Sequence, residues 1–279
     1  MKEKKKIRIG APSIIVLISL YLILPLVLTF FYSIFTEWND ILPKGFTLKY
    51  YVQLLSDGVF IQSLGRTLLI SILPILITGV IILLAMYVIV VHNPKLEKYI
   101  QLLCMIPYAL QGIILSTSII SLYVGSGSIL SNRILLLTGA YCIITLPYMY
   151  QGIRNSLTGV DAISLIEAAQ VLGVSKLYAF FRIIVPNILP GITVSAMLSM
   201  AMIFGDFAIV NTLAGSHYGT AQVYLQKKLF QSGQLSSATI MVLFLCTLGI
   251  SLLVFLIKKK EAPSHIHSKE CSDRVSSSD

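Results

Sequence analysis

The feature that most constrains the fold of this 279-residue chain is a series of six long apolar runs. A helix needs about 20 residues to cross the hydrocarbon core of a bilayer, and each run has about that length. Charged residues make up 12% of the chain, about half the share that soluble domains carry. The sequence therefore predicts an all-α polytopic membrane protein with six transmembrane helices, at residues 11–35, 67–91, 100–123, 134–153, 187–210 and 236–257.

The segments outside these runs divide into two groups by their charge. Residues 1–10, 92–99, 154–186 and 258–279 carry 15 of the 21 Lys and Arg residues, and the other three loops carry 6. The positive-inside rule places the first group, including both termini, in the cytoplasm. The first run is too long for a signal peptide and no small-residue cleavage site follows it, so we expect it to be retained. This predicts a cytoplasmic N-terminus at 1–10, a membrane domain at 11–257 and a polar, disordered cytoplasmic tail at 258–279.

The loop between the fourth and fifth runs has the pattern of two short amphipathic helices separated at Gly173. Asp161 occupies the expected N-cap of the first helix, Gly173 the left-handed position after its end, and Ser175 the N-cap of the second. Pro186 and Pro190 are expected to end the unit. Spacing of three and four residues gives each helix one apolar face, made of Ala162, Leu165, Ile166, Ala169 and Leu172, then of Leu177, Phe180, Phe181 and Ile184. Such a corner suits docking into a groove on another protein.

Ionisable residues are almost absent from the six runs, which contain Asp206 alone. Proton-coupled carriers and voltage sensors use intramembrane charges, so we expect the energy source to lie outside this chain. Asp206 either lines a translocation path or gate, where it would meet a cationic substrate, or forms a local cap or salt bridge at headgroup level. Pro107 and Pro147 lie inside two runs, where they would kink the helix. Kinked helices suit a gated pathway, although many membrane helices carry proline without moving, so these three residues are candidates for the path.

The sequence does not indicate several other kinds of site. It has no Gly-x-x-x-x-Gly-Lys-Ser/Thr loop, so we expect no P-loop ATP site. Its four cysteines form no CxxC pair and no Cys/His spacing typical of zinc. His265, His267 and Cys271 in the tail are conceivable metal ligands, but a solvated tail is the simpler interpretation. The net charge of +9 is not gathered on a basic face with interleaved aromatics, so we expect no nucleic-acid binding.

The loop after the fourth run resembles a known signature. Glu167-Ala168-Ala169 is followed after three residues by Gly173, and after nine more by Ile183-Ile184-Val185-Pro186. This is similar to the Glu-Ala-Ala signature of inner-membrane permease subunits of bacterial ABC importers, the binding-protein-dependent transport family. Val185 replaces the commoner Leu and Val174 a usual Ala, both conservatively. The resemblance covers about residues 46–255, and within the family it looks closest to the polyamine, ferric-iron, phosphonate and thiamine branch.

The resemblance implies a permease in the bacterial cytoplasmic membrane, with a cytoplasmic coupling-helix loop at 154–186. The chain would form half of a transmembrane dimer within the lipid bilayer, more often a heterodimer in that branch. It would work with two ATPase subunits, which bind the ATP, and with an extracytoplasmic solute-binding protein. The chain would then be no enzyme and would hold no cofactor. Contact with the ATPase is expected at Glu167, Ala168, Ala169, Gly173, Ser175, Leu177, Phe180, Phe181 and Pro186, with Leu177, Phe180 and Phe181 as buried anchors.

Two other classes of function remain open from the residues alone. A stand-alone secondary carrier or channel would need intramembrane charges and would transport solute as a purified chain, and inverted repeats would favour it. A non-transporting membrane scaffold would use the same loop to recruit a soluble partner. Only an uptake or ATPase-coupling measurement separates the scaffold from a permease.

Overall fold

The structure is a computed structural model that describes residues 7–37, 44–109, 112–123 and 131–261. These residues form helices joined by short connections, together with one antiparallel hairpin that pairs Phe35 with Phe46. The elements are α1 (Ile7–Ile34), β1 (Phe35–Glu37), β2 (Lys44–Phe46), α2 (Lys49–Ser56), α3 (Gly58–Val91), η1 (Pro94–Leu96), α4 (Glu97–Ala109), α5 (Gly112–Tyr123), α6 (Arg133–Val160), α7 (Ala162–Val171), α8 (Lys176–Ala179), the π-helix η3 (Phe180–Ile184), α9 (Val185–Gly205), α10 (Ala208–Leu213), η4 (Gly215–His217), α11 (Ala221–Leu229) and α12 (Gly233–Glu261).

Five stretches of helix are long and apolar enough to cross a membrane by themselves, and they match the predicted first, second, fourth, fifth and sixth runs. The predicted third run is not one straight helix, because α4 and α5 meet at an angle of 96° and make a sixth span only if the bent pair is counted as one. Predicted limits also shift: α3 begins at Gly58, and the helix of the fifth run ends at Gly205. The tail predicted at 258–279 lies largely outside the described residues.

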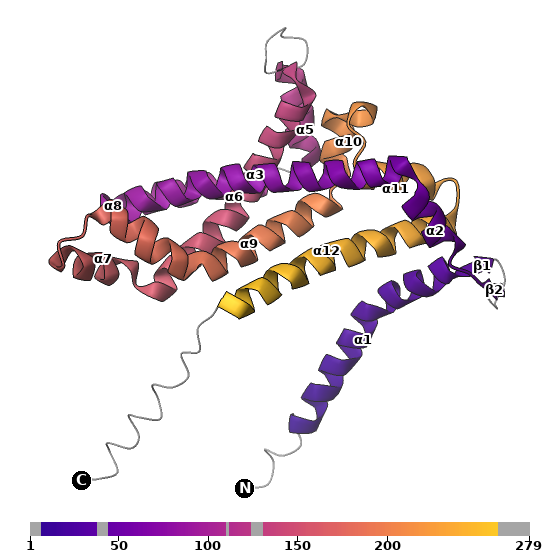
Figure 1. Cartoon of the computed structure of the whole chain (residues 1–279), viewed down its shortest axis with the longest axis horizontal. Coiled ribbons are helices and arrows are strands. Elements are labelled where there is room, and N and C mark those ends of the chain that lie inside the picture. The colour runs from indigo at the N-terminus through magenta and orange to yellow at the C-terminus, as the bar shows by residue number, and fades with distance from the viewer. Residues whose placement is uncertain (1–6, 38–43, 110–111, 124–130, 262–279) are drawn as a thin grey trace.

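The centre of the molecule is the packing of α6 against α9 and α3, whose buried side chains form one core (Figure 1). Tyr141, Tyr150 and Ile153 of α6 are completely buried there. By contrast, α1 contacts α12 and then diverges from it, and its side chains from Ile14 to Leu24 are exposed (Figure 1). Exposed apolar side chains on a membrane-spanning helix are suited to lipid or to other spanning helices. The chain is therefore a multi-pass membrane protein with a buried three-helix centre.

The contact between α6 and α9 depends on small residues that alternate across it. A Cβ atom on Gly152 would overlap Ser195, and one on Gly191 would overlap Ser156. Each helix thus places a glycine opposite the other helix's serine, and its own glycine and serine lie four positions apart. Small residues at this spacing let two membrane helices approach until their backbones are close. The two helices that flank the α7–α8 segment are therefore held together tightly.

A second, smaller cluster lies at the end of the bundle opposite α7 and α8, where α11 and α2 each pack against α3 and α12 (Figure 1). Asp57 begins α3, and its carboxylate accepts hydrogen bonds from the Val59 backbone N–H at 2.9 Å and from the Tyr224 hydroxyl at 2.8 Å. The Tyr224 ring also packs on Phe60, with the ring centroids 5.3 Å apart. The hydrogen bond from Tyr224 is the main cause that lowers the pKa of Asp57 below its usual value.

This cluster predicts a pH-dependent stability. Because folding lowers the pKa of Asp57, the ionised carboxylate stabilises the fold fully above about pH 4, which is near the pKa of an unfolded Asp. This stabilisation is lost as the pH falls through the pKa that Asp57 has in the folded protein. We expect Tyr224→Phe to cost about 1 kcal/mol at pH 7, less than is usual for a bond to a charged group because the carboxylate stays partly exposed to solvent. Thermal unfolding in detergent at pH 7 and pH 3 measures this. An equal loss at both pH values would contradict the assignment.

Candidate functional site

The segment between α6 and α9 begins with a sharp corner at Asp161. Its φ of 48° and ψ of 60° are left-handed, and Asp161 is at once the C-cap of α6 and the N-cap of α7. Among non-glycine residues Asp and Asn adopt this conformation most readily. The predicted N-cap position is confirmed, but the expected side-chain cap is wrong: the carboxylate accepts a hydrogen bond from Ser164 Oγ at 2.7 Å and none from a backbone N–H.

A second corner lies at Gly173, as predicted. Its φ is +80°, and the Gly173 N–H donates to the Gln170 carbonyl at 2.9 Å while the Val174 N–H donates to the Ala169 carbonyl at 3.0 Å. This pair of bonds is the Schellman arrangement that ends a helix with a left-handed residue. A Cβ on Gly173 would meet no atom within 4 Å, so glycine is required here by backbone conformation alone. Ser175 Oγ then accepts the Tyr178 N–H at 3.4 Å, which confirms the predicted cap of α8.

The apolar face predicted for α7 belongs to the protein's own core. Ala162, Ile166 and Ala169 are buried against the bundle. The face left open carries Glu167 and Ala168, and it ends in two strongly exposed apolar side chains, Val171 at 88% and Leu172 at 81%. The expectation that this predicted face, including Ala169, meets a partner is therefore corrected: only Leu172 of that face is free for docking.

The second half of the segment divides in a similar way. Leu177 remains 53% exposed and Phe181 40%, in agreement with a role as anchors. Phe180 is completely buried, as is Ile184, so the expectation that Phe180 anchors a partner is corrected. These two residues bound the π-helix η3, in which side chains point differently from the α-helical spacing assumed in the prediction.

Pro186 lies in the first turn of α9 and does not end the segment. Proline has no N–H to donate back along the helix, which explains the irregular turn before it. The Val185 N–H instead donates to the Phe180 carbonyl five residues earlier, and Asn187 Nδ2 donates to the Ile183 carbonyl at 2.9 Å. The helix consequently continues through Pro186 and Pro190 into the membrane-spanning part of α9.

Asp206 lies at the far end of α9 from this segment (Figure 1). Its Oδ2 accepts hydrogen bonds from the Tyr141 hydroxyl at 2.9 Å and from the Ile209 N–H at 3.1 Å. The carboxylate therefore holds the start of α10 and ties it to α6. Nothing in the sequence identified Tyr141 as this partner, because an aromatic residue in an apolar run is ordinarily a core residue.

The other two candidates for the path lie inside helices, Pro107 in α4 and Pro147 in α6. Pro147 is buried in the core, and α6 is a single helix across it.

Near the segment, the Arg154 guanidinium of α6 pairs with the Glu97 carboxylate at the start of α4, with 2.6 Å between Nε and Oε1. This pair joins two loops that the sequence analysis treated separately.

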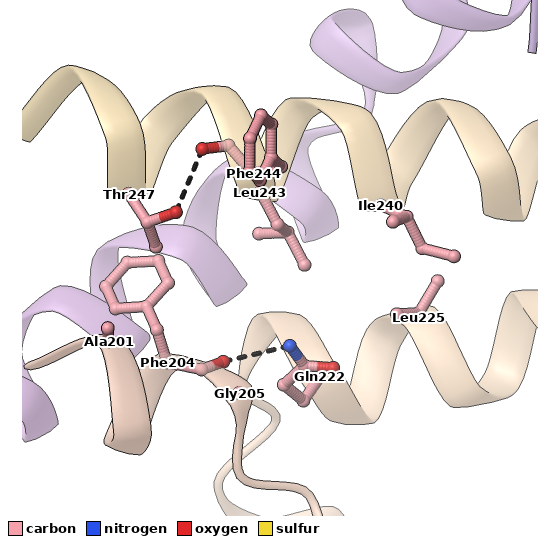
Figure 2. Close-up of a pocket in the computed structure, with 9 residues that line it drawn as sticks. All are labelled: Ala201, Phe204, Gly205, Gln222, Leu225, Ile240, Leu243, Phe244 and Thr247. Carbon is pink, nitrogen blue, oxygen red and sulfur yellow. Dashed lines mark hydrogen bonds between the residues drawn. The ribbon is translucent and has the colours of Figure 1, made fainter. Parts of the chain in front are cut away.

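A pocket of about 200 Å³ lies between α9, α11 and α12, lined mainly by apolar side chains (Figure 2). Figure 2 shows Gln222 pointing toward Phe204, whose carbonyl accepts its Nε2–H at 2.9 Å. Thr247 Oγ donates to the Phe244 carbonyl at 2.9 Å. Since these polar groups already bond within the chain, the pocket has the character of a packing gap. Within the described ranges, no three His, Cys, Asp or Glu side chains gather to hold a metal ion.

Comparison with known proteins places this geometry in a family. Residues 82–261 match the family described as "Binding-protein-dependent transport system inner membrane component". Probable ABC transporter permease protein y4fN of Sinorhizobium fredii is 26% identical over 172 residues, which are 60% of this chain and only 29% of that protein. Probable sulfate transport system permease protein cysT of Prototheca wickerhamii is 25% identical over 198 residues, 67% of this chain and 73% of that protein.

One relative has a higher sequence identity over fewer residues, and a solved structure shares the fold. Spermidine/putrescine transport system permease protein PotB of Escherichia coli is 38% identical over 73 residues, 26% of each protein. A chain in the crystal structure of a bacterial alginate ABC transporter, in complex with its alginate-bound periplasmic protein, superposes with a TM-score of 0.62 at 18% identity, covering 88% of this chain and 91% of that one. The family match at residues 82–261 spans well over half of the present chain. This chain therefore belongs to the family of binding-protein-dependent transport system inner membrane components, the inner-membrane permeases of ABC importers.

Proposed function

We propose that this chain forms half of the translocation pathway of an ATP-driven importer and is coupled to a separate ATPase by the segment from Asp161 to Ile184. The observation that carries the proposal is the shape of this segment. It is fixed by two left-handed corners, it packs on the bundle through one face, and it leaves a second face exposed. A short helix held at both ends is suited to transmit force without bending.

The proposed contact surface, here called the coupling face, consists of side chains that the structure leaves exposed: Glu167, Ala168, Val171, Leu172, Leu177 and Phe181. The apolar members at the tip would fill a groove on the ATPase, and the carboxylate of Glu167 would bond at its rim. Fully desolvated apolar anchors surrounded by polar contacts are the usual source of affinity in such interfaces. Ala169, Gly173 and Ser175 support this face from behind, by packing, by backbone conformation and by capping.

In this proposal the chain itself hydrolyses nothing. ATP binding would close the paired ATPase subunits, and their movement would reach α6 and α9 through the two ends of the segment. The close glycine–serine contact between α6 and α9 supports this, because two helices packed so tightly move as one body. Asp206 would hold α10 against α6 at the opposite end, where the pathway opens to a solute-binding protein. Pro107 and Pro147 remain proposed members of the path.

The proposed orientation follows the charge count, with both termini and the coupling face in the cytoplasm. The second half of the pathway would be a related but different permease. A substrate of the polyamine, phosphonate, ferric-iron or thiamine class is supported by the resemblance to that branch and by the match to PotB. The relatives are named for sulfate and spermidine/putrescine, and the structural relative imports alginate, so selectivity would reside chiefly in the binding protein.

Purification of the tagged chain from its native membranes in mild detergent tests this function. We expect an ATPase subunit to co-purify in an amount comparable to the chain, together with a second permease, and mass spectrometry identifies both. Ala168→Arg places a large charge on the coupling face without touching the core and should remove the ATPase subunit. Recovery of the chain alone, with solute transport by that chain in liposomes, would show a stand-alone carrier instead.

A further inference from the structure

The segment from Asp161 to Ile184 contacts a third helix besides the two that it joins. The ring of Tyr87, near the end of α3, lies 5.3 Å from the Phe180 ring and 6.0 Å from the Phe181 ring, measured between centroids. The two phenylalanine rings are themselves 5.3 Å apart and nearly perpendicular. On its other side Tyr87 meets the ring of His92 at 5.5 Å. These four residues, here called the aromatic cluster, connect α3 to the segment.

The aromatic cluster is anchored at a fixed point of the backbone. Phe180 begins the π-helix η3 and is completely buried, and the residue that ends it, Ile184, is buried as well. Tyr87 makes an edge-to-face pair with Phe180 and a tilted contact with Phe181. Such ring contacts add to the stabilisation that comes from buried area, so α3 should follow the part of the segment next to α9.

The opposite end of the segment contacts α3 beside a cavity. This cavity, of about 250 Å³, is lined by Met86, Ile89 and Val90 of α3 and by Ala162 and Ile163 of α7, among other residues. A void removes some of the contacts that would otherwise carry a displacement from one helix to the other. The cavity therefore weakens the contact of α7 with α3 at this end, whereas the rings of the aromatic cluster touch directly.

We propose that Tyr87 is a positioning residue that transmits the movement of the coupling segment to α3, and this rests on the function proposed above. When an ATPase moves the coupling face, α6 and α9 follow through the continuous backbone. The third helix of the central core, α3, follows through its packing against α6 and α9 and, at the end next to the segment, through the ring of Tyr87. Loss of the ring should leave the ATPase bound and reduce the movement of α3.

The experiment uses the complex of this chain with its co-purifying ATPase subunits, reconstituted in nanodiscs. Spin labels replace exposed Gln62 at the start of α3 and Ile134 at the start of α6, in a background without the four native cysteines. The distance between labels is measured by pulsed electron resonance, without nucleotide and with MgATP and vanadate. In the wild type we expect the distance to change, and in Tyr87→Leu we expect that change to be clearly smaller. Tyr87→Phe keeps the ring and should behave as the wild type.

The outcomes separate this proposal from the one on which it rests. A wild-type shift in Tyr87→Leu, or the absence of a shift in the wild-type complex, would overturn transmission through Tyr87. Release of the ATPase subunit by Tyr87→Leu would assign the ring to docking and equally overturn it. If Tyr87→Leu unfolds, Tyr87→Met fills more of the space without a ring and should likewise reduce the shift. Failure of the wild type to retain any ATPase subunit would instead reject the proposed function.

Discussion

Gly173→Val is expected to release the ATPase subunit and to abolish uptake while the chain still inserts into the membrane. The φ of +80° at this position costs a non-glycine residue about 1–2 kcal/mol, and a β-branched side chain is the least tolerant of it. The helix end would rearrange, because the bonds from the Gly173 and Val174 N–H groups depend on this corner. Since 1.4 kcal/mol is tenfold in affinity, we expect about a tenfold or larger loss of co-purified ATPase.

Gly173→Asn is the matched control for this prediction. Asparagine adopts the left-handed conformation far more readily than valine, and no atom lies within 4 Å of the added Cβ. It should therefore retain most of the ATPase subunit. Equal retention in the valine variant would show that the corner does not position the coupling face, and equal loss in both variants would show that something other than φ is required of residue 173.

Gly191→Ala is expected to cause the largest loss of stability among glycine-to-alanine changes at the glycines that the structure describes. The new Cβ would overlap Ser156 of α6, where the backbone carbonyl of Gly152 is also close. Overpacking of a dense core typically costs about 1–3 kcal/mol, and here the backbones of two helices must separate to relieve it. We expect a lower yield of folded protein and a lower unfolding temperature, read by thermal unfolding in detergent.

Gly159→Ala provides the comparison on the facing helix, α6. Its Cβ would meet nothing within 4 Å, and alanine is favoured over glycine inside a helix by about 0.5–1 kcal/mol. This variant should keep or raise the unfolding temperature. Ser156→Ala combined with Gly191→Ala should recover part of the lost stability, because it removes the oxygen that the new methyl group meets. No difference between Gly191→Ala and Gly159→Ala would mean that α6 and α9 are not packed as described.

Much of the coupling segment was predictable because its constraints are local. A left-handed position favours glycine, and a helix start favours a hydroxyl side chain, so Gly173 and Ser175 could be placed from their neighbours alone. Which face of the segment is buried and which is exposed could not be predicted from neighbouring residues. Phe180 reads as one member of an apolar stripe, and only the π-helix before Pro186 turns its ring into the bundle.

The sequence by itself determined the helical, membrane-spanning class, since runs of about 20 apolar residues have no other stable arrangement in a bilayer. It also determined the two corners that shape the coupling segment. Only the tertiary structure decided that residues 100–123 form two helices at 96°, that Asp206 is bonded to Tyr141, and that Tyr87 meets Phe180 and Phe181. The last two features join residues about 65 to 94 positions apart, and periodicity reports which face of a helix is apolar but never which helix covers it.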